Sequence, residues 1–365
     1  MTEKLRVGVI GTGMAFERLH YPAFVKLADK YEIAAVCDPD RFKAEKWANK
    51  LGLDKIDVYA HFLEMTKRED IDVFDIIVPI ELNYEITRAV AEAIAGKNKG
   101  IICEKPLAPN AEEAEFHREL PKEFRIPVMI AENYRYSEEM NILRDIIRQG
   151  KIGAVNFFLL LRAFDFKDEM GDNNFAARDW RQHPEFEGGI FLDASVHDMA
   201  ALRHIFGAIS KVQAFGQRKQ DIGGQWGVIN LNILFQSGMT GQYTFYAAGK
   251  QPQYPPVGLR IFGEKGLIYL EDASAGLINV FYNDGGTEQM HYEPGKGYFN
   301  ELLNFYRALQ GKEPLYVSPE MEYGDAKTIF AALRSIAGEE IVPVDVSSRY
   351  EQDARKTGED AERVL

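Results

Sequence analysis

Cysteine is scarce in this chain of 365 residues, and the two that occur, Cys37 and Cys103, each stand in an apolar run. Two such residues do not make a disulfide framework, so we expect both to be small buried side chains in a protein of the reducing cytosol. The seven histidines show no spacing typical of metal ligands, which predicts that the chain uses no catalytic metal.

Long apolar runs and an excess of positive charge are also missing. No run approaches the roughly 18 residues that a membrane helix needs, and the charged start of the chain leaves no room for the apolar core of a signal peptide. The formal net charge of -13 repels nucleic acid phosphates and anionic membrane surfaces, and no basic patch opposes it. We therefore expect a cytoplasmic protein that binds a small molecule, without nucleic acid or membrane partners.

The length of the chain predicts two domains, at about 100 to 200 residues each. Up to about residue 131, short apolar runs alternate with amphipathic stretches, which is typical of βαβ units and a doubly wound parallel sheet. After residue 150, runs rich in β-branched and aromatic residues are separated by turn residues, which favours an antiparallel or mixed sheet with helices. We predict an α/β domain at 1–131, an α+β domain at 132–346 and a charged tail at 347–365.

These patterns give specific elements. The expected strands are Leu5–Ile10, Ile33–Cys37, Val73–Val78, Ile101–Cys103 and Val128–Ala131, then Val155–Phe164, Val228–Phe235, Thr240–Ala247, Leu259–Phe262, Leu267–Glu271 and Leu277–Tyr282. Helices are expected near 14–29, 41–51, 84–96, 110–120, 137–149, 195–206, 298–310 and 320–337.

A glycine motif directly follows the first expected strand. Gly11, Thr12 and Gly13 have the G-x-G pattern that opens a dinucleotide phosphate loop. The first glycine permits a tight turn, the second lets the backbone approach a pyrophosphate, and a helix that begins near Met14 directs its N-terminal dipole at the anion. A G-x-G by itself is weak evidence and favours a plain turn, and the third position of the motif holds Phe16 in place of glycine or alanine.

Two further segments strengthen the dinucleotide hypothesis. Asp38 ends the second strand, where its carboxylate can accept a hydrogen bond from a ribose 2′-hydroxyl and repel a 2′-phosphate. The cofactor expected is therefore NAD, although Arg41 keeps NADP possible. Pro79 and Asn83 follow the third strand, in a loop expected to run along the dinucleotide, where any single residue can equally serve an ordinary loop.

Glu104, Lys105 and Pro106 close the next apolar run. The usual place for a lysine is the solvent-facing surface. Beside a nicotinamide, however, an ammonium can hydrogen-bond a substrate hydroxyl and stabilise the developing alkoxide. We count Glu104 and Lys105 among the cofactor-binding candidates, and the bond to Pro106 is a candidate for the cis isomer.

A second cluster of polar residues lies in the C-terminal half. Asp193 and His197 are four residues apart, so a helix would place them on one face. A histidine titrates near neutral pH, and a carboxylate beside it can orient the ring and stabilise its charged form. The alternative is structural: an aspartate at a helix N-terminus, followed by a buried histidine whose hydrogen bonds are made within the protein. Asp198 is compatible with either arrangement.

Aromatic and basic side chains complete the candidate substrate site. An indole offers a flat face for the C–H side of a sugar ring, and guanidinium groups offer forked donors for hydroxyls or a carboxylate. The same residues would also suit a structural loop with salt bridges. The candidates that complete the substrate site, beside Lys105, Asp193 and His197, are Tyr134, Arg178, Trp180 and Arg181.

The order and spacing of GTG at 11–13, EKP at 104–106 and DASVHD at 193–198 resemble the family of glucose-fructose oxidoreductase, inositol dehydrogenase and MocA (Gfo/Idh/MocA) over nearly the whole chain. The resemblance implies an N-terminal Rossmann domain and a C-terminal domain with a large, mostly antiparallel open sheet, which commonly packs in homodimers or homotetramers. It also implies that Lys105 polarises the substrate oxygen and that His197 removes the hydroxyl proton. Asp193 would orient the histidine or relay that proton. At Phe16 the chain departs from the commonest loop.

Three functions are compatible with this resemblance. The first is an NAD(P)-dependent dehydrogenase that moves a hydride between the nicotinamide and a secondary hydroxyl or ketone of a sugar, polyol or sugar derivative. The second is an NAD-dependent glycosidase, which oxidises its substrate transiently, eliminates the aglycone and recycles the cofactor. The third is a non-catalytic nucleotide-binding sensor, although a sensor has no need for all of Lys105, Asp193 and His197.

Overall fold

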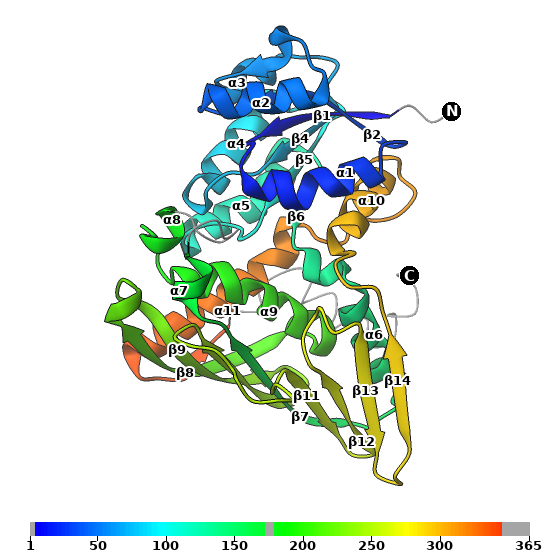
Figure 1. The fold of residues 1–365 in the computed structure, drawn as a ribbon, viewed down its shortest axis with the longest axis vertical. Helices are drawn as coiled ribbons and strands as arrows, with labels where there is room; N and C mark the ends of the chain where they lie inside the picture. Colours follow the sequence, from blue (N-terminus) through cyan, green and yellow to red (C-terminus); the bar gives the residue numbers. More distant parts are fainter. Residues whose placement is uncertain (1–3, 172–178, 345–365) are drawn as a thin grey trace. The chain divides into compact units, whose positions relative to one another are not determined.

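The computed structural model describes residues 4–171 and 179–344. The chain divides into two compact units, which are coloured by sequence in Figure 1: unit 1 is Met1–Asn133 with Gly297–Tyr323, and unit 2 is Tyr134–Lys296 with Gly324–Leu365. The segment Gly297–Tyr323 thus returns to unit 1, which the sequence-based boundaries do not include. The predicted tail at 347–365 lies outside the described residues.

Unit 1 contains a parallel sheet of six strands in the order β3-β2-β1-β4-β5-β6, which confirms the predicted doubly wound arrangement. Its central strands β4 and β5 are buried along their whole length, as expected for apolar runs covered on both faces. The strand order reverses between β1 and β4, and such a reversal opens a ligand crevice at the carboxyl ends of the strands. The strands are β1 (Leu5–Ile10), β2 (Tyr31–Cys37), β3 (Val58–Tyr59), β4 (Val73–Ile76), β5 (Gly100–Glu104) and β6 (Val128–Ala131).

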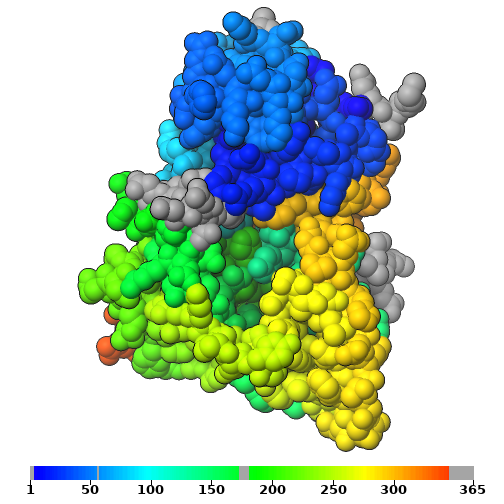
Figure 2. All heavy atoms as spheres, in the orientation of Figure 1, coloured from blue at the N-terminus to red at the C-terminus, as the bar shows by residue number. Residues whose placement is uncertain are grey.

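Helices cover this sheet, and α10, which comes from the late segment of the chain, lies beside α1 (Figures 1 and 2). The Tyr31 hydroxyl donates to the Leu302 carbonyl oxygen at 2.7 Å, which ties α10 to strand β2. Asp40 and Asn110 cap α2 and α5 through their side chains. The helices of unit 1 are α1 (Tyr21–Lys26), α2 (Arg41–Leu51), α3 (Phe62–Met65), α4 (Asn83–Ile94), α5 (Ala111–Phe124) and α10 (Gly297–Leu309), with short 3₁₀ turns at η2 (Lys55–Asp57) and η3 (Ile80–Leu82).

The helix after the glycine motif contains a π-helical turn, η1 (Phe16–His20), before α1 begins. Phe16 takes the place of the small third residue of the motif. Its side chain is fully buried and its ring packs edge-on against Trp47, with the centroids 4.7 Å apart. An aromatic core contact therefore replaces the close helix–strand packing that glycine or alanine gives in the usual motif, and π turns of this kind are frequent at functional sites.

Unit 2 is built on a nine-stranded sheet in the order β14-β13-β12-β11-β7-β10-β9-β8-β15. Strands β7 and β10 pair in parallel, and the other described pairs are antiparallel, which confirms the predicted large, mostly antiparallel sheet. The strands are β7 (Val155–Ala163), β8 (Ile209–Lys219), β9 (Gln225–Phe235), β10 (Thr240–Tyr246), β11 (Leu259–Gly263), β12 (Gly266–Leu270), β13 (Leu277–Tyr282), β14 (Thr287–His291) and β15 (Val342–Pro343).

The helices α9 and α11 lie over one face of this sheet (Figure 1). Asp325 of α11 accepts hydrogen bonds from Arg203 of α9 and from Arg135, so a buried ionic cluster holds the two helices together. The opposite face leaves Phe157, Phe215 and other apolar side chains exposed. The remaining helices are α6 (Glu138–Arg148), α7 (Phe166–Glu169), α8 (Asp179–Gln182), α9 (Ile190–Phe206) and α11 (Pro319–Gly338), with 3₁₀ turns at η4 (Asn133–Tyr136) and η5 (Gln220–Ile222).

Both cysteines are free and buried, as predicted for small core side chains. Burial raises the pKa of the Cys37 thiol and of the Cys103 thiol to about 12, so neither is a reactive thiolate near neutral pH. Among the described residues, no helix combines the length and the apolar character that crossing a membrane requires.

Candidate active site

The glycine loop of unit 1 has one closed and one open side. Gly11 has a φ of +95°, and a Cβ there would lie 1.9 Å from the Ile77 carbonyl oxygen, so the turn admits only glycine. A Cβ at Gly13 would meet no atom of the described residues within 4 Å. The helical segment begins at Met14, and the first N–H groups of a helix lack partners within it. Open space beside a glycine backbone and a helix start suits a pyrophosphate.

Asp38 fixes a negative charge beside this loop. Its Oδ2 accepts hydrogen bonds from the Thr12 backbone N at 2.9 Å and from Thr12 Oγ1 at 3.0 Å, and its Oδ1 accepts from the Asp40 backbone N at 2.9 Å. The carboxylate is 7% exposed. Arg41 instead has a side chain that is 79% exposed and pairs with Glu45 along α2. The carboxylate is thus the ordered charge at the end of β2.

The turn that carries Lys105 lies at the same edge of the sheet, because β4 alone separates β1 from β5. Asn83 donates from Nδ2 to the carbonyl oxygens of Glu104 at 2.9 Å and Pro106 at 2.8 Å. The Lys105 backbone N donates to Glu104 Oε2 at 3.1 Å, and the peptide bond to Pro106 is cis, as the sequence allowed. Asn83 is fully buried, so in this structure its side-chain amide holds the lysine turn. Pro79, the other predicted residue of this loop, is the N-cap of η3.

In unit 2, α9 carries the predicted pair on one face. The helix begins at Ile190, five residues before the predicted start, because the Ile190 backbone N is anchored by Gln225 Oε1 at 3.0 Å. Asp193 is 6% exposed and accepts from Arg181 Nε at 2.8 Å. The half-buried ring of His197 stacks on Tyr134, with centroids 4.6 Å apart and planes at 18°.

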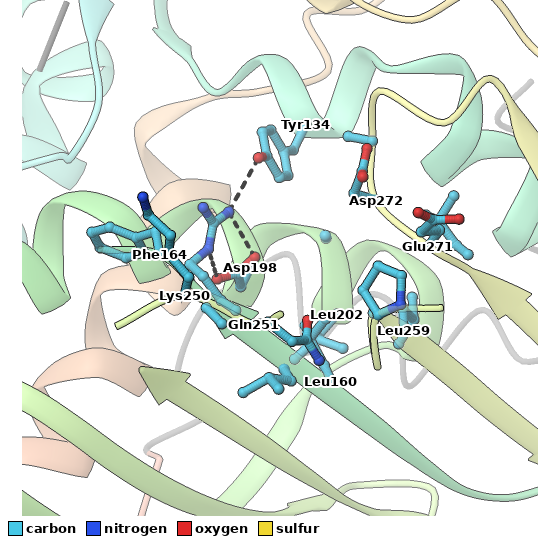
Figure 3. A pocket seen from close by; sticks show the side chains of 18 of the residues that line it. Tyr134, Leu160, Phe164, Asp198, Leu202, Lys250, Gln251, Leu259, Glu271 and Asp272 are labelled. Atoms are coloured by element: carbon cyan, nitrogen blue, oxygen red, sulfur yellow. Dashed lines mark hydrogen bonds and ion pairs between the residues drawn. The ribbon is translucent and has the colours of Figure 1, made fainter. Parts of the chain in front are cut away.

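Asp198 has a different set of partners from His197. It accepts from the Tyr243 hydroxyl at 2.7 Å. It also accepts from Arg162 Nη2 at 2.9 Å, and Arg162 donates to the Tyr134 hydroxyl at 3.1 Å (Figure 3). Burial alone would lower the pKa of Arg162, but the charge and hydrogen bond of Asp198, together with Tyr134 and Tyr243, outweigh burial and hold that pKa well above its ordinary value. Burial and Asp198 both raise the pKa of Tyr243. Asp198 is therefore the counter-ion of Arg162.

Of these groups, Tyr134, Arg162 and Asp198 border a cavity of about 540 Å³ within unit 2. Figure 3 shows leucine side chains on one side of it and polar groups around them. Lys250 at its rim forms an ion pair with Asp168. The charged residues of the lining are two bases and six acids, a formal charge of -4: Arg162 and Lys250, and Asp165, Asp168, Glu169, Asp198, Glu271 and Asp272.

The structure groups the predicted residues within each unit. Thr12 and Asp38 are bonded to each other, Asn83, Glu104 and Lys105 form one turn, and Arg181 and Tyr134 contact Asp193 and His197 respectively. Arg178 lies outside the described residues, and Trp180 is described only as part of the α8 backbone.

Sequence reasoning missed Arg162, Tyr243 and Lys250. A signal existed for the first of them. Arg162 interrupts an apolar strand run, and a charge in that position needs a buried partner.

Comparison with known proteins places both parts of the chain. The model described as "Oxidoreductase family, NAD-binding Rossmann fold" matches residues 5–131, and the model of the GFO/IDH/MocA C-terminal domain matches residues 140–269. An uncharacterized protein of Saccharomyces cerevisiae is 26% identical over 91% of this chain and 96% of its own length. Myo-inositol 2-dehydrogenase of Thermotoga maritima is 23% identical over 87% of this chain and 91% of its own.

Solved structures show the same architecture. An oxidoreductase from Thermotoga maritima superposes with a TM-score of 0.80 at 27% identity, covering 94% of this chain and 99% of that one. Levoglucosan dehydrogenase in complex with NADH superposes with a TM-score of 0.81 at 22% identity, covering 94% and 100%, a likeness of fold. With an NAD-binding Rossmann model and a specific C-terminal model matched in tandem, the chain belongs to the Gfo/Idh/MocA family of oxidoreductases.

Proposed function

We propose that this protein is an NAD-dependent dehydrogenase that oxidises a secondary hydroxyl of a neutral or amine-bearing polyol or sugar, or reduces the corresponding ketone. The observation that carries the proposal is the loop at Gly11 to Gly13: closed at its first glycine, open at its last, and fixed to the Asp38 carboxylate. Two strands away at the same sheet edge stands Lys105, on a turn held by three hydrogen bonds.

Asp38 supports NAD as the preferred cofactor. A carboxylate at the end of the second strand accepts hydrogen bonds from ribose hydroxyls and repels a 2′-phosphate. Because two backbone N–H groups and a hydroxyl already hold it in place, it cannot swing away from a phosphate at low cost. Gly11, Gly13 and the start of the helix at Met14 would hold the pyrophosphate, and the nicotinamide supplies the hydride acceptor when it is bound.

Lys105, Asp193 and His197 are the proposed catalytic residues. The Lys105 ammonium donates a hydrogen bond to the substrate oxygen and stabilises the negative charge that develops on it. The His197 imidazole accepts the hydroxyl proton, and its stacking on Tyr134 limits the ring to one orientation. Asp193, held by Arg181, orients the substrate or relays the proton on the same face of α9.

The cavity of unit 2 supports the substrate class. Its formal charge of -4 disfavours sugar acids and phosphorylated sugars, whereas polyhydroxyl compounds find donors and acceptors in the lining. A cationic amine on the substrate would be attracted by the same charge. Leu160, Leu202 and Leu259 provide apolar surface for the C–H side of a ring.

The direct test is a screen of inositols, neutral sugars, amino sugars, uronic acids and glycosides with NAD⁺ and NADP⁺, in which the absorbance of the reduced nicotinamide is followed. We expect reduction of NAD⁺ with neutral or amine-bearing polyols and no reduction with uronic acids. Release of an aglycone without net NADH would instead identify an NAD-dependent glycosidase. Cofactor binding without any turnover would favour the sensor.

Lys105→Ala tests the catalytic assignment. We expect kcat to fall by about 10²- to 10³-fold, as when one donor to a developing oxyanion is removed, with the Kd for NAD⁺ measured by calorimetry nearly unchanged. Lys122→Ala is the matched control, because Lys122 is an exposed lysine of the same unit that pairs with Glu119 on α5. Wild-type turnover in Lys105→Ala would remove the lysine from the mechanism.

A further inference from the structure

A histidine outside the proposed catalytic trio lies between two carboxylates beneath the Lys105 turn. His20 ends the π-helical turn and is fully buried. Its Nδ1 lies 3.0 Å from Asp75 Oδ2, and its Nε2 lies 2.8 Å from Glu104 Oε1. Asp75 comes from the middle of β4 and is also fully buried.

This geometry determines the charge on the ring. A neutral imidazole donates from one nitrogen only, so its second nitrogen would face a carboxylate lone pair. The imidazolium donates from both nitrogens and satisfies both carboxylates. Burial by itself lowers the pKa of His20, but the charge and hydrogen bond of Asp75, together with those of Glu104, outweigh burial and raise that pKa well above 6.5.

Two other carboxyl groups influence the cluster. Glu301 of α10 is fully buried, and neither of its oxygens has a hydrogen-bond partner in the part of the chain that the structure describes. Burial raises its pKa well above 4.5, and Glu104, Glu132 and Asp75 raise it further, although His20 lowers it. Glu301 therefore keeps its proton to a higher pH than an ordinary glutamate does. The carboxylates of Asp75 from β4 and Glu104 from β5 contact the His20 ring, and Glu301 from α10 interacts electrostatically with His20 and with Glu132, which follows β6. Tyr298 of α10 adds an aromatic contact, with its ring centroid 6.0 Å from that of His20.

The Glu104 side chain connects the cluster to Lys105. Glu104 uses Oε1 toward His20 and Oε2 to accept the Lys105 backbone N–H. The His20 proton therefore orients the Glu104 carboxylate through Oε1, and the carboxylate fixes the backbone of the lysine turn through Oε2. Among the described residues, no group of three or more His, Cys, Asp or Glu side chains is arranged as metal ligands.

We propose that His20 is a positioning residue for Lys105: as an imidazolium bridging Asp75 and Glu104, it holds the Glu104 carboxylate where that group fixes the backbone of the lysine turn. The catalytic consequence rests on the proposed function, because it requires Lys105 to contact the substrate. Loss of the imidazolium proton leaves two buried carboxylates without their shared counter-ion. Glu104 then reorients or takes up a proton, and the backbone from which the Lys105 side chain extends is no longer held in place.

The activity test uses Asp75→Asn and His20→Gln. Asp75→Asn removes one counter-charge without touching Glu104 or Lys105, so the alkaline limb of the kcat profile moves to lower pH by about 1 to 3 pH units. His20→Gln lowers kcat by on the order of 10- to 100-fold, as a displaced catalytic group does, and leaves the Kd for NAD⁺ within about threefold. A purely structural role would lower stability without moving the pH profile.

His117→Gln is the matched control. His117 is a fully buried histidine of the same unit, but its Nδ1 donates to the Leu107 carbonyl oxygen at 2.6 Å, and among the described residues only burial and this bond shift its pKa. Burial lowers its pKa to about 4, so it is neutral. We expect its substitution to leave the pH profile of kcat in place. A profile of Asp75→Asn that superimposes on that of the wild type overturns the proposal.

A measurement independent of turnover separates this inference from the proposed function. In ¹⁵N NMR spectra of the full chain, the His20 ring, assigned by its loss in His20→Gln, should show two protonated nitrogens from pH 6 to 8, and the Lys105 amide should shift in Asp75→Asn. A ring that titrates near pH 6.5, or an unmoved Lys105 amide, overturns the inference. If the NMR result holds but the wild type reduces no cofactor with any screened compound, the proposed function alone has failed.

Discussion

At the scale of single residues, Asp38 has two roles in one carboxylate. It holds the Thr12 backbone and hydroxyl, and it presents a fixed negative charge where a ribose 2′-substituent would lie. These roles make different demands on a substitution. A neutral residue would remove the repulsion of a 2′-phosphate and would also loosen the loop that binds every dinucleotide.

Asp38→Ser should therefore lower kcat/KM for NAD⁺ by about tenfold, the equivalent of one charge-assisted hydrogen bond of about 1.4 kcal/mol. The ratio of kcat/KM for NADP⁺ to that for NAD⁺ should rise by about 10- to 100-fold. Steady-state kinetics with both cofactors checks this. Glu64→Gln controls for the loss of one negative charge, since Glu64 is an exposed residue of the same unit that pairs with Lys67. An unchanged ratio in Asp38→Ser would show that another group selects the cofactor.

Charged residues inside apolar strands indicate buried ion pairs, and the predictions from the sequence did not use this signal. Asp75 interrupts the run of β4, and Arg162 interrupts that of β7. A charge at such a position is retained only with a buried partner. The sequence could thus predict that each has a partner, but it could not name His20 or Asp198, because both contacts join residues distant along the chain.

At the scale of elements, the link between β7 and α9 depends on the Arg162–Asp198 pair. The Asp198 side chain is 7% exposed and that of Arg162 is 25% exposed. Removing one partner from a buried pair costs about 3 to 5 kcal/mol, because the other charge is left without compensation. Partial exposure of Arg162 lets water screen the remaining charge and reduces that cost.

Arg162→Met should accordingly lower the free energy of unfolding of unit 2 by about 2 to 4 kcal/mol, and raise KM because the guanidinium borders the cavity. In urea titrations followed by circular dichroism, the double variant with Asp198→Asn should lose less than the sum of the two single variants. Lys151→Met is the control: its pair with Glu288 is more exposed, at 29% and 38%, and is worth about 0 to 1 kcal/mol. Strict additivity in the double variant would contradict the coupling.

Elements with strong periodicity were predictable, and elements shaped by their neighbours were not. The apolar runs of β1, β5 and β6 and the amphipathic patterns of α2 and α11 lie where the sequence places them. Strand β14, with its sequence TEQMH, alternates between exposed and half-buried residues at the edge of the sheet, so its pairing with β13 and not its own burial makes it a strand. Strand β8 was missed because its long alternation includes small and polar residues.

At the scale of the whole molecule, the return of residues 297–323 to unit 1 could not be read from local patterns. Sequence periodicity shows that α10 is a helix, but not which sheet it covers. The return brings Glu301, an acid with no ordinary reason to be buried, against the carboxylates around His20. A site whose parts come from β4, β5, η1 and α10 has no motif of its own.

The buried cluster should also set how the stability of unit 1 depends on pH. Glu301 and His20 have pKa values raised above 4.5 and 6.5, so between those values and the raised ones the folded chain keeps protons that the unfolded chain has lost. Stability therefore falls as pH rises through that window. His117 of unit 1, whose pKa burial lowers to about 4, acts in the opposite sense, but only below about pH 6.5.

From pH 6.5 to 8.5, therefore, we expect the free energy of unfolding to fall, with each of the two groups contributing up to about 1.4 kcal/mol per pH unit while it stays protonated in the folded chain. Glu301→Gln keeps the shape of the side chain without a titrating proton, so its stability should fall less steeply over this range. Urea titrations at several pH values measure the slopes, with Glu288→Gln, an exposed carboxylate of unit 2, as the control. If the free energy of unfolding had the same slope against pH in Glu301→Gln and in the wild type, Glu301 would be ionised in the folded protein. The cluster around His20 would then carry one more negative charge than a protonated Glu301 gives it.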